Sequence, residues 1–513
     1  MNGKSGSAGH ERQRSTVWWV RRDLRLADNQ ALAAALAEGG PVIPVFVLDP
    51  ALLASPSAGE KRLAFLYGGL RQLDADLRSR GSGLIVRAGR PPDALARLVE
   101  ESGAGAIYAE ADYSPYARRR DGRVGERLPL RLVPGLTVHP PEGVLKANGE
   151  PYTVFTPFAR RWRQSSLPTA QSVHPAPDRI PTPAGVASDP IPDEPVLTGA
   201  VPFRPGEREA ARRLEAFIDW EGSPIYRYGE GRDRLDGAGS SGLSPYLRFG
   251  MLSARQAVAS ARAAIETAPD GAARASAEAW LNELIWREFY ISILAHYPEV
   301  LETSFRADLR GIRWSDDRAA FRAWCEGQTG YPAVDAAMRQ LRETGWISNR
   351  ARMMVASFLV KDLLIDWRWG ERWFMEQLVD GDPAANNGGW QWTAGTGTDA
   401  APYFRIFNPI TQGKKHDPDG DTIRRWVPEL ARVAQEQIHE PWKMSAETQR
   451  AAGCSIGRDY PAPIVDHGWA RERALQAYAA GRTLSAREQT GREGDDDYHN
   501  REEQVGRQTR SDH

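Results

Sequence analysis

Four side chains that could bind a planar, polar molecule recur at helical spacing within W-L-N-E-L-I-W-R-E-F-Y (280–290). Glu283, Trp286, Arg287 and Tyr290 occupy positions i, i+3, i+4 and i+7, so a helix would place them on one face. There the indole could stack on a ring while the carboxyl group bonds the edge of that ring. The alternative is an ordinary helix with a Glu–Arg pair and a packed tryptophan.

A second cluster lies in the stretch N-R-A-R-M. Asn349 and Met353 are again four residues apart, and they combine an amide that donates and accepts with an adaptable thioether. Arg350 and Arg352 add positive charge beside them. The alternative is a helix N-terminus at Ser348 followed by an ordinary core methionine.

The stretch D-G-D-P-A-A-N-N-G-G-W-Q-W (380–392) holds two acids, two asparagines and three glycines after a predicted helix. We expect a polar loop that exposes its backbone, which suits a heteroaromatic ring with several donors and acceptors. A plain turn is the alternative, although a turn alone would not need the two tryptophans that follow. Tryptophan is dense throughout this region, because ten of the chain's 17 lie between 280 and 392. They stand at positions 280, 286, 314, 324, 346, 367, 369, 373, 390 and 392.

The stretch A-G-S-S-G-L-S-P (238–245) combines glycines with serine hydroxyls. Free backbone N–H groups in such a segment predict an anion-binding nest for a phosphate. The alternative is a flexible linker that ends at Ser244 as a helix N-cap.

The elements that must position these groups fall into two patterns. Short apolar runs alternate with helical patterns up to about residue 140, which predicts an α/β domain with a doubly wound parallel sheet. From 207 onward the pattern is helical, and 380–392 would follow a helix at 370–379. The expected strands are 16–20, 41–50, 84–89, 106–110 and 137–139, and the expected organisation is a tail at 1–14, an α/β domain at 15–145, a connector at 146–206, an all-α domain at 207–480 and a charged, disordered tail at 481–513.

Composition narrows the class of protein. Lys plus Arg is 66 and Asp plus Glu is 67, so nucleic-acid binding would need a local basic rim instead of a net positive charge. The only cysteines, Cys325 and Cys454, allow no disulfide framework or cysteine metal site, which suits the cytoplasm. We expect no metal and no membrane span.

Together these stretches resemble the DNA photolyase/cryptochrome family, and most of all the class I cyclobutane pyrimidine dimer photolyases. The resemblance begins at W-V-R-R-D-L-R-L-A-D-N (19–29), includes T-G-Y-P-A-V-D-A-A-M-R-Q-L (329–341) and F-R-I-F-N-P (404–409), and ends near 464–467. It implies an N-terminal antenna domain, a helical FAD-binding domain and light-driven repair of pyrimidine dimers. A cryptochrome-like blue-light receptor is the alternative.

The resemblance also implies roles for single residues. Those that would hold FAD are Tyr228, Ser240, Ser241, Gly242, Leu243, Ser244, Trp280, Asn349, Arg352, Asp380, Gly381, Asp382 and Asn386, with Arg352 paired to Asp380 and Asn386 facing the flavin N5 edge. Those that would receive the dimer are Glu283, Trp286, Asn349, Met353 and Trp392, and the electron-transfer chain would be Trp390, Trp367 and Trp314. Contacts to DNA, bound by a monomer with the dimer flipped out, would come from Arg232, Trp286, Arg287, Asn349, Arg350 and Arg405.

Three positions distinguish members of the family. Six-four photolyases would have histidine at Asn349 and Met353, and cryptochromes usually have Asp or Cys at Asn386. Folate-binding members carry an Asn-Glu pair where this chain has Pro115 and Tyr116. The resemblance therefore favours dimer repair, and a deazaflavin antenna over methenyltetrahydrofolate.

Overall fold

The computed structural model describes residues 14–55, 58–218 and 222–485. The expected disordered tails therefore lie outside the described residues, apart from Arg14 at one end and 481–485 at the other. Residues 481–485 are helical, because they continue a helix that begins at 467. The chain divides into two compact units, each treated separately below. Unit 1 comprises 1–298, 341–346 and 374–385, and unit 2 comprises 299–340, 347–373 and 386–513.

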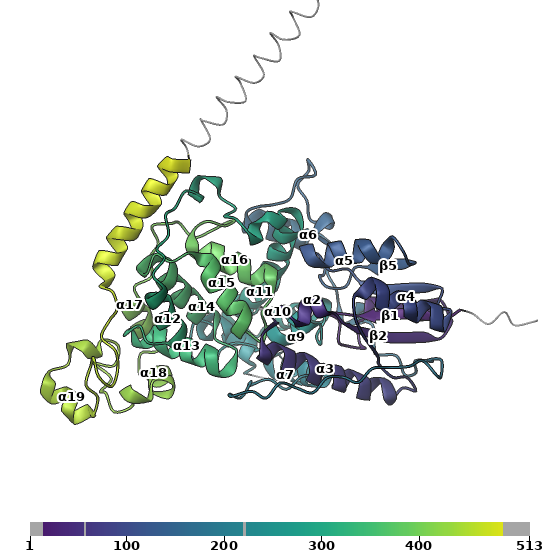
Figure 1. Cartoon of the computed structure of the whole chain (residues 1–513), viewed down its shortest axis with the longest axis horizontal. Helices are drawn as coiled ribbons and strands as arrows, with labels where there is room; N and C mark the ends of the chain where they lie inside the picture. Colours follow the sequence, from purple (N-terminus) through teal and green to yellow (C-terminus); the bar gives the residue numbers. More distant parts are fainter. Residues whose placement is uncertain (1–13, 56–57, 219–221, 486–513) are drawn as a thin grey trace, which may run out of the picture. The chain divides into compact units, whose positions relative to one another are not determined.

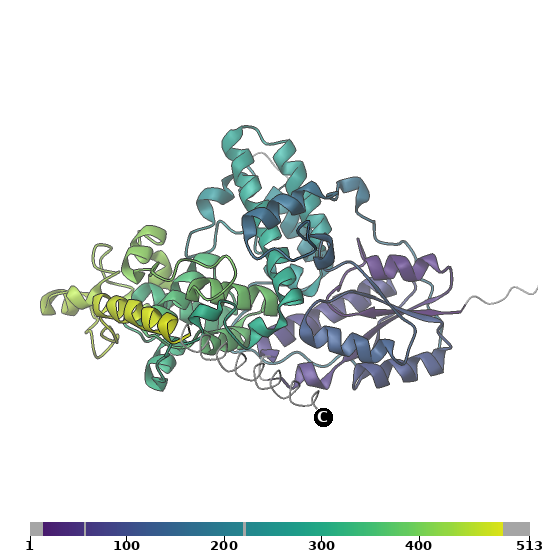
Figure 2. The same ribbon diagram turned by 90° about the horizontal axis from the view of Figure 1, so that it is seen from above.

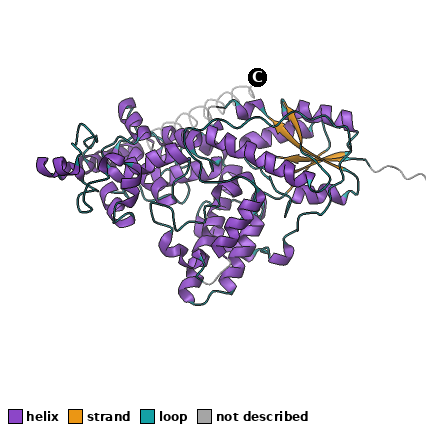
Figure 3. Cartoon of the chain, turned by 90° about the horizontal axis from the view of Figure 1, so that it is seen from below, coloured by secondary structure: helices purple, strands orange, loops and turns teal. Residues whose placement is uncertain are grey.

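Unit 1 contains a five-stranded parallel sheet in the order β3-β2-β1-β4-β5 (Figures 1 and 3). Its strands are β1 (Thr16–Val20), β2 (Val42–Leu48), β3 (Ile85–Ala88), β4 (Ala106–Glu110) and β5 (Leu130–Val133). Every residue of β1, β2 and β4 is buried, as expected for strands covered on both faces. The covering helices are α1 (Gln30–Ala37), α3 (Glu60–Arg78), α4 (Pro91–Ser102) and α5 (Pro115–Gly125), with the short α2 (Pro50–Leu53) after β2.

The strand order reverses between β1 and β4, which pair directly. In doubly wound sheets this switch point is where polar groups gather, beyond the carboxyl ends of the strands. Here the segment R-R-D-L-R-L-A-D-N follows β1, and A-D-Y-S-P-Y follows β4. The predicted sheet and four of its five strands are confirmed.

The expected fifth strand at 137–139 was wrong, since β5 lies at Leu130–Val133. A buried carboxylate explains the difference. The backbone N–H groups of Val138 and His139 donate to Glu288 at 2.5 and 3.4 Å instead of to a neighbouring strand. Trp162 Nε1 donates to the same carboxylate at 2.6 Å. Glu288 therefore fastens this segment to a helix, a role that helical spacing did not reveal.

The rest of unit 1 is helical. Helices α10 (Ala254–Glu266) and α11 (Gly271–His296) lie side by side (Figure 2). Ser253 and Asp270 cap them through side-chain oxygens, which satisfies N–H groups that a helix start leaves unpaired. The remaining elements are η2 (Pro141–Gly143), α6 (Phe155–Gln164), η3 (Ala170–Ser172), α7 (Glu207–Ile218), η4 (Pro224–Arg227), α8 (Tyr228–Gly231) and α9 (Ser244–Phe249).

Unit 2 shows no strand among its described residues, only isolated bridges. It contains α12 (Arg318–Glu326), α14 (Asn349–Ser357), a π-helical turn (Phe358–Asp362), α17 (Pro409–His416), α18 (Asp421–Trp426), α19 (Ala446–Ala452) and the helix at 467–485. Three helices continue from one unit into the other: α13 (Pro332–Thr344), α15 (Trp367–Gln377) and α16 (Pro383–Ala394). Within the described residues, no helix has the length and apolar character needed to cross a membrane.

The expected loop at 380–392 was also wrong, because most of it forms α16. The Asp382 carboxylate accepts hydrogen bonds from the N–H groups of Ala384 and Ala385 at 2.9 and 3.2 Å. Proline tolerates the first helical position, where its missing N–H costs nothing. The D-P pair therefore starts a helix in spite of the glycines.

Candidate functional site

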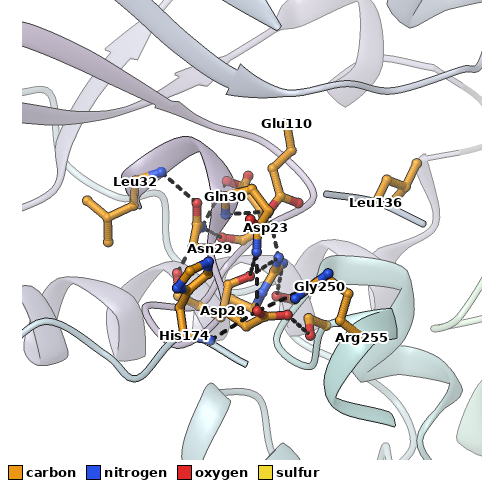
Figure 4. A network of polar contacts seen from close by, with 12 residues as sticks. Asp23, Asp28, Asn29, Gln30, Leu32, Glu110, Leu136, His174, Gly250 and Arg255 are labelled. Carbon is orange, nitrogen blue, oxygen red and sulfur yellow. Dashed lines mark hydrogen bonds and ion pairs between the residues drawn. The ribbon is translucent and has the colours of Figure 1, made fainter. Parts of the chain in front are cut away.

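The segment after β1 is held by a buried polar network (Figure 4). Arg25 pairs with Glu110 at 2.6 Å and donates to the Gly250 carbonyl at 3.1 Å. Asp28 accepts from the Ser253 hydroxyl at 2.6 Å. The network joins the carboxyl end of the sheet to the segment between α9 and α10. Arg25 and Asp28 of R-R-D-L-R-L-A-D-N therefore hold the fold together.

Arg22 differs from its neighbours, because it pairs with Asp382, a predicted flavin contact. Arg248 lies 3.8 Å from the same carboxylate and donates to the Gly381 carbonyl at 2.6 Å. Burial alone would raise the pKa of Asp382, but Arg22, Arg248 and Arg287 outweigh it and lower that pKa to about 2. Asp382 is therefore a fixed anion that also caps α16. Sequence spacing gave no sign of Arg22 as its partner.

The predicted phosphate segment needs glycine at two positions. A Cβ at Gly239 would come within 2.2 Å of the Gly231 carbonyl oxygen, and Gly242 has a φ of +63°. Ser240 and Ser241 are half-buried and Ser244 is exposed, with its hydroxyl accepting from Trp346 Nε1 at 3.2 Å. The serine hydroxyls, none of them fully buried, have the chemistry to bind the diphosphate of FAD. The expected Ser244 N-cap was wrong, since Ser244 is the first residue of α9.

Two aromatic residues of the predicted flavin site belong to the interior of unit 1. Tyr228 is 8% exposed and Trp280 is 3% exposed. The Phe217 ring packs against both, with ring centroids 6.1 Å from Tyr228 and 5.2 Å from Trp280. Asp380 is also buried. Its predicted pairing with Arg352 joins residues of different units and stays a prediction.

On α11, Glu283 pairs with Arg232 and not with Arg287. The distance from Glu283 Oε1 to the Arg232 guanidinium is 2.8 Å. Burial raises the pKa of Glu283, while the charge of Arg232 and its hydrogen bond lower it. Arg287 instead donates to the carbonyls of Leu136 and Leu247, at 3.1 and 3.4 Å. The i,i+4 pair allowed by the sequence is therefore replaced by a partner about fifty residues upstream.

One face of the Trp286 indole packs against another ring of the protein. Phe155 stacks on it with ring centroids 3.7 Å apart and an interplanar angle of 3°. Phe289 meets it edge-on at 5.5 Å, and Tyr290 lies 5.4 Å away. The stack fixes the plane of a half-buried indole. Phe155 was missed by sequence reasoning, because it lies on another helix and carries no polar group.

The predicted site residues that belong to unit 2 start on α14. Ser348 caps this helix by accepting from the Ala351 N–H, so the helix-start interpretation of Ser348 is confirmed. Asn349 is exposed and its amide nitrogen lies 3.8 Å from the Met353 sulfur. Arg352 donates to the Ile347 carbonyl at 3.1 Å. An exposed amide beside a thioether leaves both available for a bound base.

On α16, the Asn386 amide nitrogen donates to the Glu371 carbonyl at 3.0 Å, while Trp392 is half-buried. Asn387 and Gln391 both donate to the Val300 carbonyl, at 2.9 and 2.8 Å. Part of the polar character of this stretch therefore holds the helix in unit 2 and is not available to a ligand.

The three tryptophans of the predicted electron-transfer chain differ in burial. Trp390 is 2% exposed and Trp367 is fully buried, whereas Trp314 is half-buried and meets Tyr478 edge-on at 5.9 Å. Gly370, one turn after Trp367 on α15, lies against Trp390, since a Cβ there would come within 2.0 Å of the indole. Glycine therefore lets α15 approach Trp390 closely.

Of the residues predicted to contact DNA in unit 2, Arg350 is half-buried and Arg405 is exposed. Arg405 follows a short turn closed by its N–H, which donates to the Pro402 carbonyl at 2.8 Å. No group of three or more His, Cys, Asp or Glu side chains within the described part of the chain is placed to hold a metal ion.

Comparisons with known proteins identify the family of the chain. Residues 16–182 match the family model described as DNA photolyase, and residues 280–480 match the FAD binding domain of DNA photolyase. The deoxyribodipyrimidine photo-lyase of Synechococcus sp. is 41% identical over 477 residues, covering 90% of this chain and 96% of that protein.

Two solved structures are similar over the same extent. The class III photolyase of Agrobacterium tumefaciens has a TM-score of 0.85 and 38% identity, covering 93% of this chain and 100% of its own. The cryptochrome of Synechocystis sp. has a TM-score of 0.83 and 31% identity, covering 90% and 99%. Because identity of about 40% extends over nine tenths of the chain, the protein belongs to the DNA photolyase family.

Proposed function

We propose that this protein is a light-dependent deoxyribodipyrimidine photo-lyase that uses FAD to repair cyclobutane pyrimidine dimers in DNA. The observation that carries the proposal is the α11 face, where a carboxyl group stands one helical turn from an indole held flat by Phe155. The name of the Synechococcus relative supports the same activity. Such an enzyme would act on DNA in the cytoplasm, as a monomer that associates with the nucleoid.

The residues assigned to FAD by resemblance have suitable chemistry. Ser240 and Ser241 would bind the diphosphate from the glycine-rich segment, and Asp382 supplies a permanent anion. Arg22 and Arg248 hold that anion in place. Bound, reduced FAD supplies on absorbing blue light the electron that opens the cyclobutane ring.

The remaining chemistry belongs to the chain's own side chains. A dimer flipped out of the duplex would lie against Trp286 and Trp392, and a damaged pair unstacks at reduced cost; photolyases are among the standard examples of such base flipping. Protonated Glu283 would donate a hydrogen bond to a pyrimidine carbonyl, and this bond strengthens as the carbonyl gains negative charge. Asn349 would hold the base edge, while Arg350 and Arg405 would bind phosphates.

We further propose class I behaviour, because the dimer pocket carries Asn349 and Met353 instead of histidine. The photolyase of Agrobacterium is named class III, and both classes are photolyases. For the antenna we propose a deazaflavin in preference to a folate. Pro115 and Tyr116 supply neither the amide nor the carboxylate of the Asn-Glu pair, and Tyr116 instead donates to Asp49.

The proposed activity predicts that FAD-loaded, reduced protein will restore thymines in ultraviolet-irradiated oligothymidine under blue light. It should leave six-four photoproducts unchanged, since Asn349 and Met353 lack the acid–base chemistry of histidine. Chromatography of the oligonucleotide measures both results, with an identical sample kept dark as the control. Light-independent repair, or restored thymines from a six-four substrate, would overturn the proposal.

A second prediction concerns Phe155. Phe155→Ala should lower the preference for dimer-containing over undamaged DNA about fivefold, which corresponds to the loss of about 1 kcal/mol of aromatic stacking that orients Trp286. Fluorescence anisotropy with both DNAs measures the preference. Phe155→Tyr keeps the ring and should keep the preference. If Phe155→Ala weakens binding to both DNAs equally, Phe155 supports the fold and does not orient Trp286.

A cryptochrome-like blue-light receptor is the alternative function, and it is less favoured, because the cryptochrome of Synechocystis is 31% identical whereas relatives at 40–41% identity are named photo-lyases. A receptor would respond to light without turning over dimers. The repair assay therefore separates the two functions: many thymine pairs restored per protein molecule identify an enzyme, whereas none identifies a receptor.

A further inference from the structure

The pair between Arg232 and Glu283 joins two predicted functional groups with different tasks. Arg232 follows α8 as its C-cap, and Glu283 lies in the middle of α11, which packs against α8 and η4. The guanidinium and the carboxylate are 2.8 Å apart, and their side chains remain 33% and 31% exposed. A ligand in solution can therefore reach both partners of this pair.

The groups facing Glu283 set its charge. Burial favours the neutral carboxyl, Arg232 opposes burial by favouring the carboxylate, and Asp233 again favours the neutral form. Tyr228, whose ring lies 5.5 Å from the Arg232 guanidinium, is a neutral phenol because burial raises its pKa. The pKa of Glu283 is raised, with burial as the largest cause, and Arg232 is the cation in this set that favours the carboxylate against burial, through a contact of 2.8 Å.

An ionised Glu283 cannot perform the role proposed for it. A carboxylate only accepts hydrogen bonds, and a pyrimidine carbonyl also only accepts them. Donation to the carbonyl requires the protonated carboxyl. In the free protein Arg232 pairs with Glu283 and so favours the carboxylate, which cannot donate. Glu283 must therefore be protonated when the lesion is bound.

We propose that Arg232 is shared between Glu283 and the DNA backbone, so that a phosphate binding to Arg232 makes Glu283 take up one proton from water. This inference rests on the proposed function, and it adds a step that couples binding of the DNA backbone to protonation of Glu283. The guanidinium does not have to leave Glu283 completely. A phosphate charge beside the pair already cancels the field that favours the carboxylate.

The direction of the effect follows from the pKa of Glu283 in the two states. Binding of a phosphate removes the influence that lowers this pKa, so the pKa is higher in the complex than in the free protein. At a pH between the two values, binding takes up about one proton per complex. Below both values the carboxyl is already protonated, and above both it stays ionised, so uptake vanishes on either side.

The test measures proton uptake in darkness. FAD-loaded protein is titrated with a dimer-containing oligonucleotide in weak buffer with a pH indicator, across a range of pH. Wild type should take up about one proton more per complex than Glu283→Gln, which cannot titrate. Arg232→Ala should not take up this extra proton, because without Arg232 burial already favours the neutral carboxyl of Glu283 before DNA arrives. Infrared difference spectra should show a protonated carboxyl band that appears on binding in wild type and not in Glu283→Gln.

Arg234→Ala is the matched control. Arg234 lies two residues from Arg232, is exposed and pairs with Asp236 at 2.6 Å, so its loss removes a nearby positive charge but leaves the Arg232–Glu283 pair. It should retain the proton uptake. Uptake that is the same in wild type and Glu283→Gln, or no new carboxyl band in DNA-bound wild type, would refute the proposal. The repair assay is separate from this test. A protein that repairs dimers but shows no proton uptake on binding DNA would refute the sharing of Arg232 and leave the proposed repair activity standing.

Discussion

Replacing Asp382 with alanine is expected to lower the free energy of unfolding of the protein by about 4 kcal/mol. The substitution removes the carboxylate that pairs with both Arg22 and Arg248 and leaves Asp112, 3.7 Å from Arg22, as their remaining anion, in a region where burial already lowers the pKa of Arg248. It also removes the cap of α16, whose loss alone costs about 1 kcal/mol. Urea unfolding followed by circular dichroism measures the change.

A matched aspartate shows whether burial is the cause. Asp93 pairs with Arg127 at 2.7 Å, but both side chains are about half exposed, at 50% and 52%. Asp93→Ala should therefore change stability far less than Asp382→Ala. Equal losses in the two variants would mean that the Asp382 pair behaves like a surface pair.

The difference in unfolding free energy between wild type and Asp382→Ala should depend on pH in a definite direction. The pKa of Asp382 is about 2 in the folded protein, below its ordinary value of 3.8. Its contribution is fully present above about pH 4 and is lost as the pH falls through about 2. The stability gap between wild type and Asp382→Ala should therefore narrow on acidification. A gap that stays constant down to pH 2 would contradict the lowered pKa.

The α/β domain could be predicted because its strands are buried on both faces and read as continuous apolar runs, as in V-I-P-V-F-V-L. The edge strand β5 could not be recognised, because Arg131 and Leu132 are exposed and the segment has no such run. The T-V-H segment looked more like a strand, yet its N–H groups bind Glu288. Local propensity cannot detect a carboxylate supplied from 150 residues away.

The same limit applies to the site. Spacing placed Glu283 and Trp286 on one helix face, but it suggested Arg287 as the partner of Glu283, and the structure has Arg232. Glycine content suggested a loop at 380–392, but the hydrogen bond from Ala384 to Asp382 caps a helix there instead. Contacts such as those of Arg22, Phe155 and Gly370 depend on tertiary packing, which no periodicity encodes.

Gly370 bears directly on the last prediction, since it brings the helix of Trp367 against Trp390. We expect Trp390→Phe to reduce light-driven reduction of bound, oxidised flavin by more than about tenfold, a barrier increase above about 1.4 kcal/mol. Phenylalanine fills most of the space but is much harder to oxidise than an indole. Repair by protein that has been chemically reduced beforehand should be largely retained, because that reaction needs no electron from Trp390.

Trp324 is the matched control for Trp390. It is also fully buried and lies 6.1 Å from Trp390 between ring centroids, but its Nε1 donates to the Val355 carbonyl at 3.0 Å and it is not part of the predicted chain. Trp324→Phe should therefore photoreduce its flavin at a rate close to that of wild type, measured by absorbance under blue light with an external reductant. If Trp324→Phe loses light-driven flavin reduction and Trp390→Phe keeps it, the first electron donor is Trp324. If neither variant is impaired, electrons reach the flavin by a route that avoids both rings, and the predicted chain through Trp367 and Trp314 is wrong.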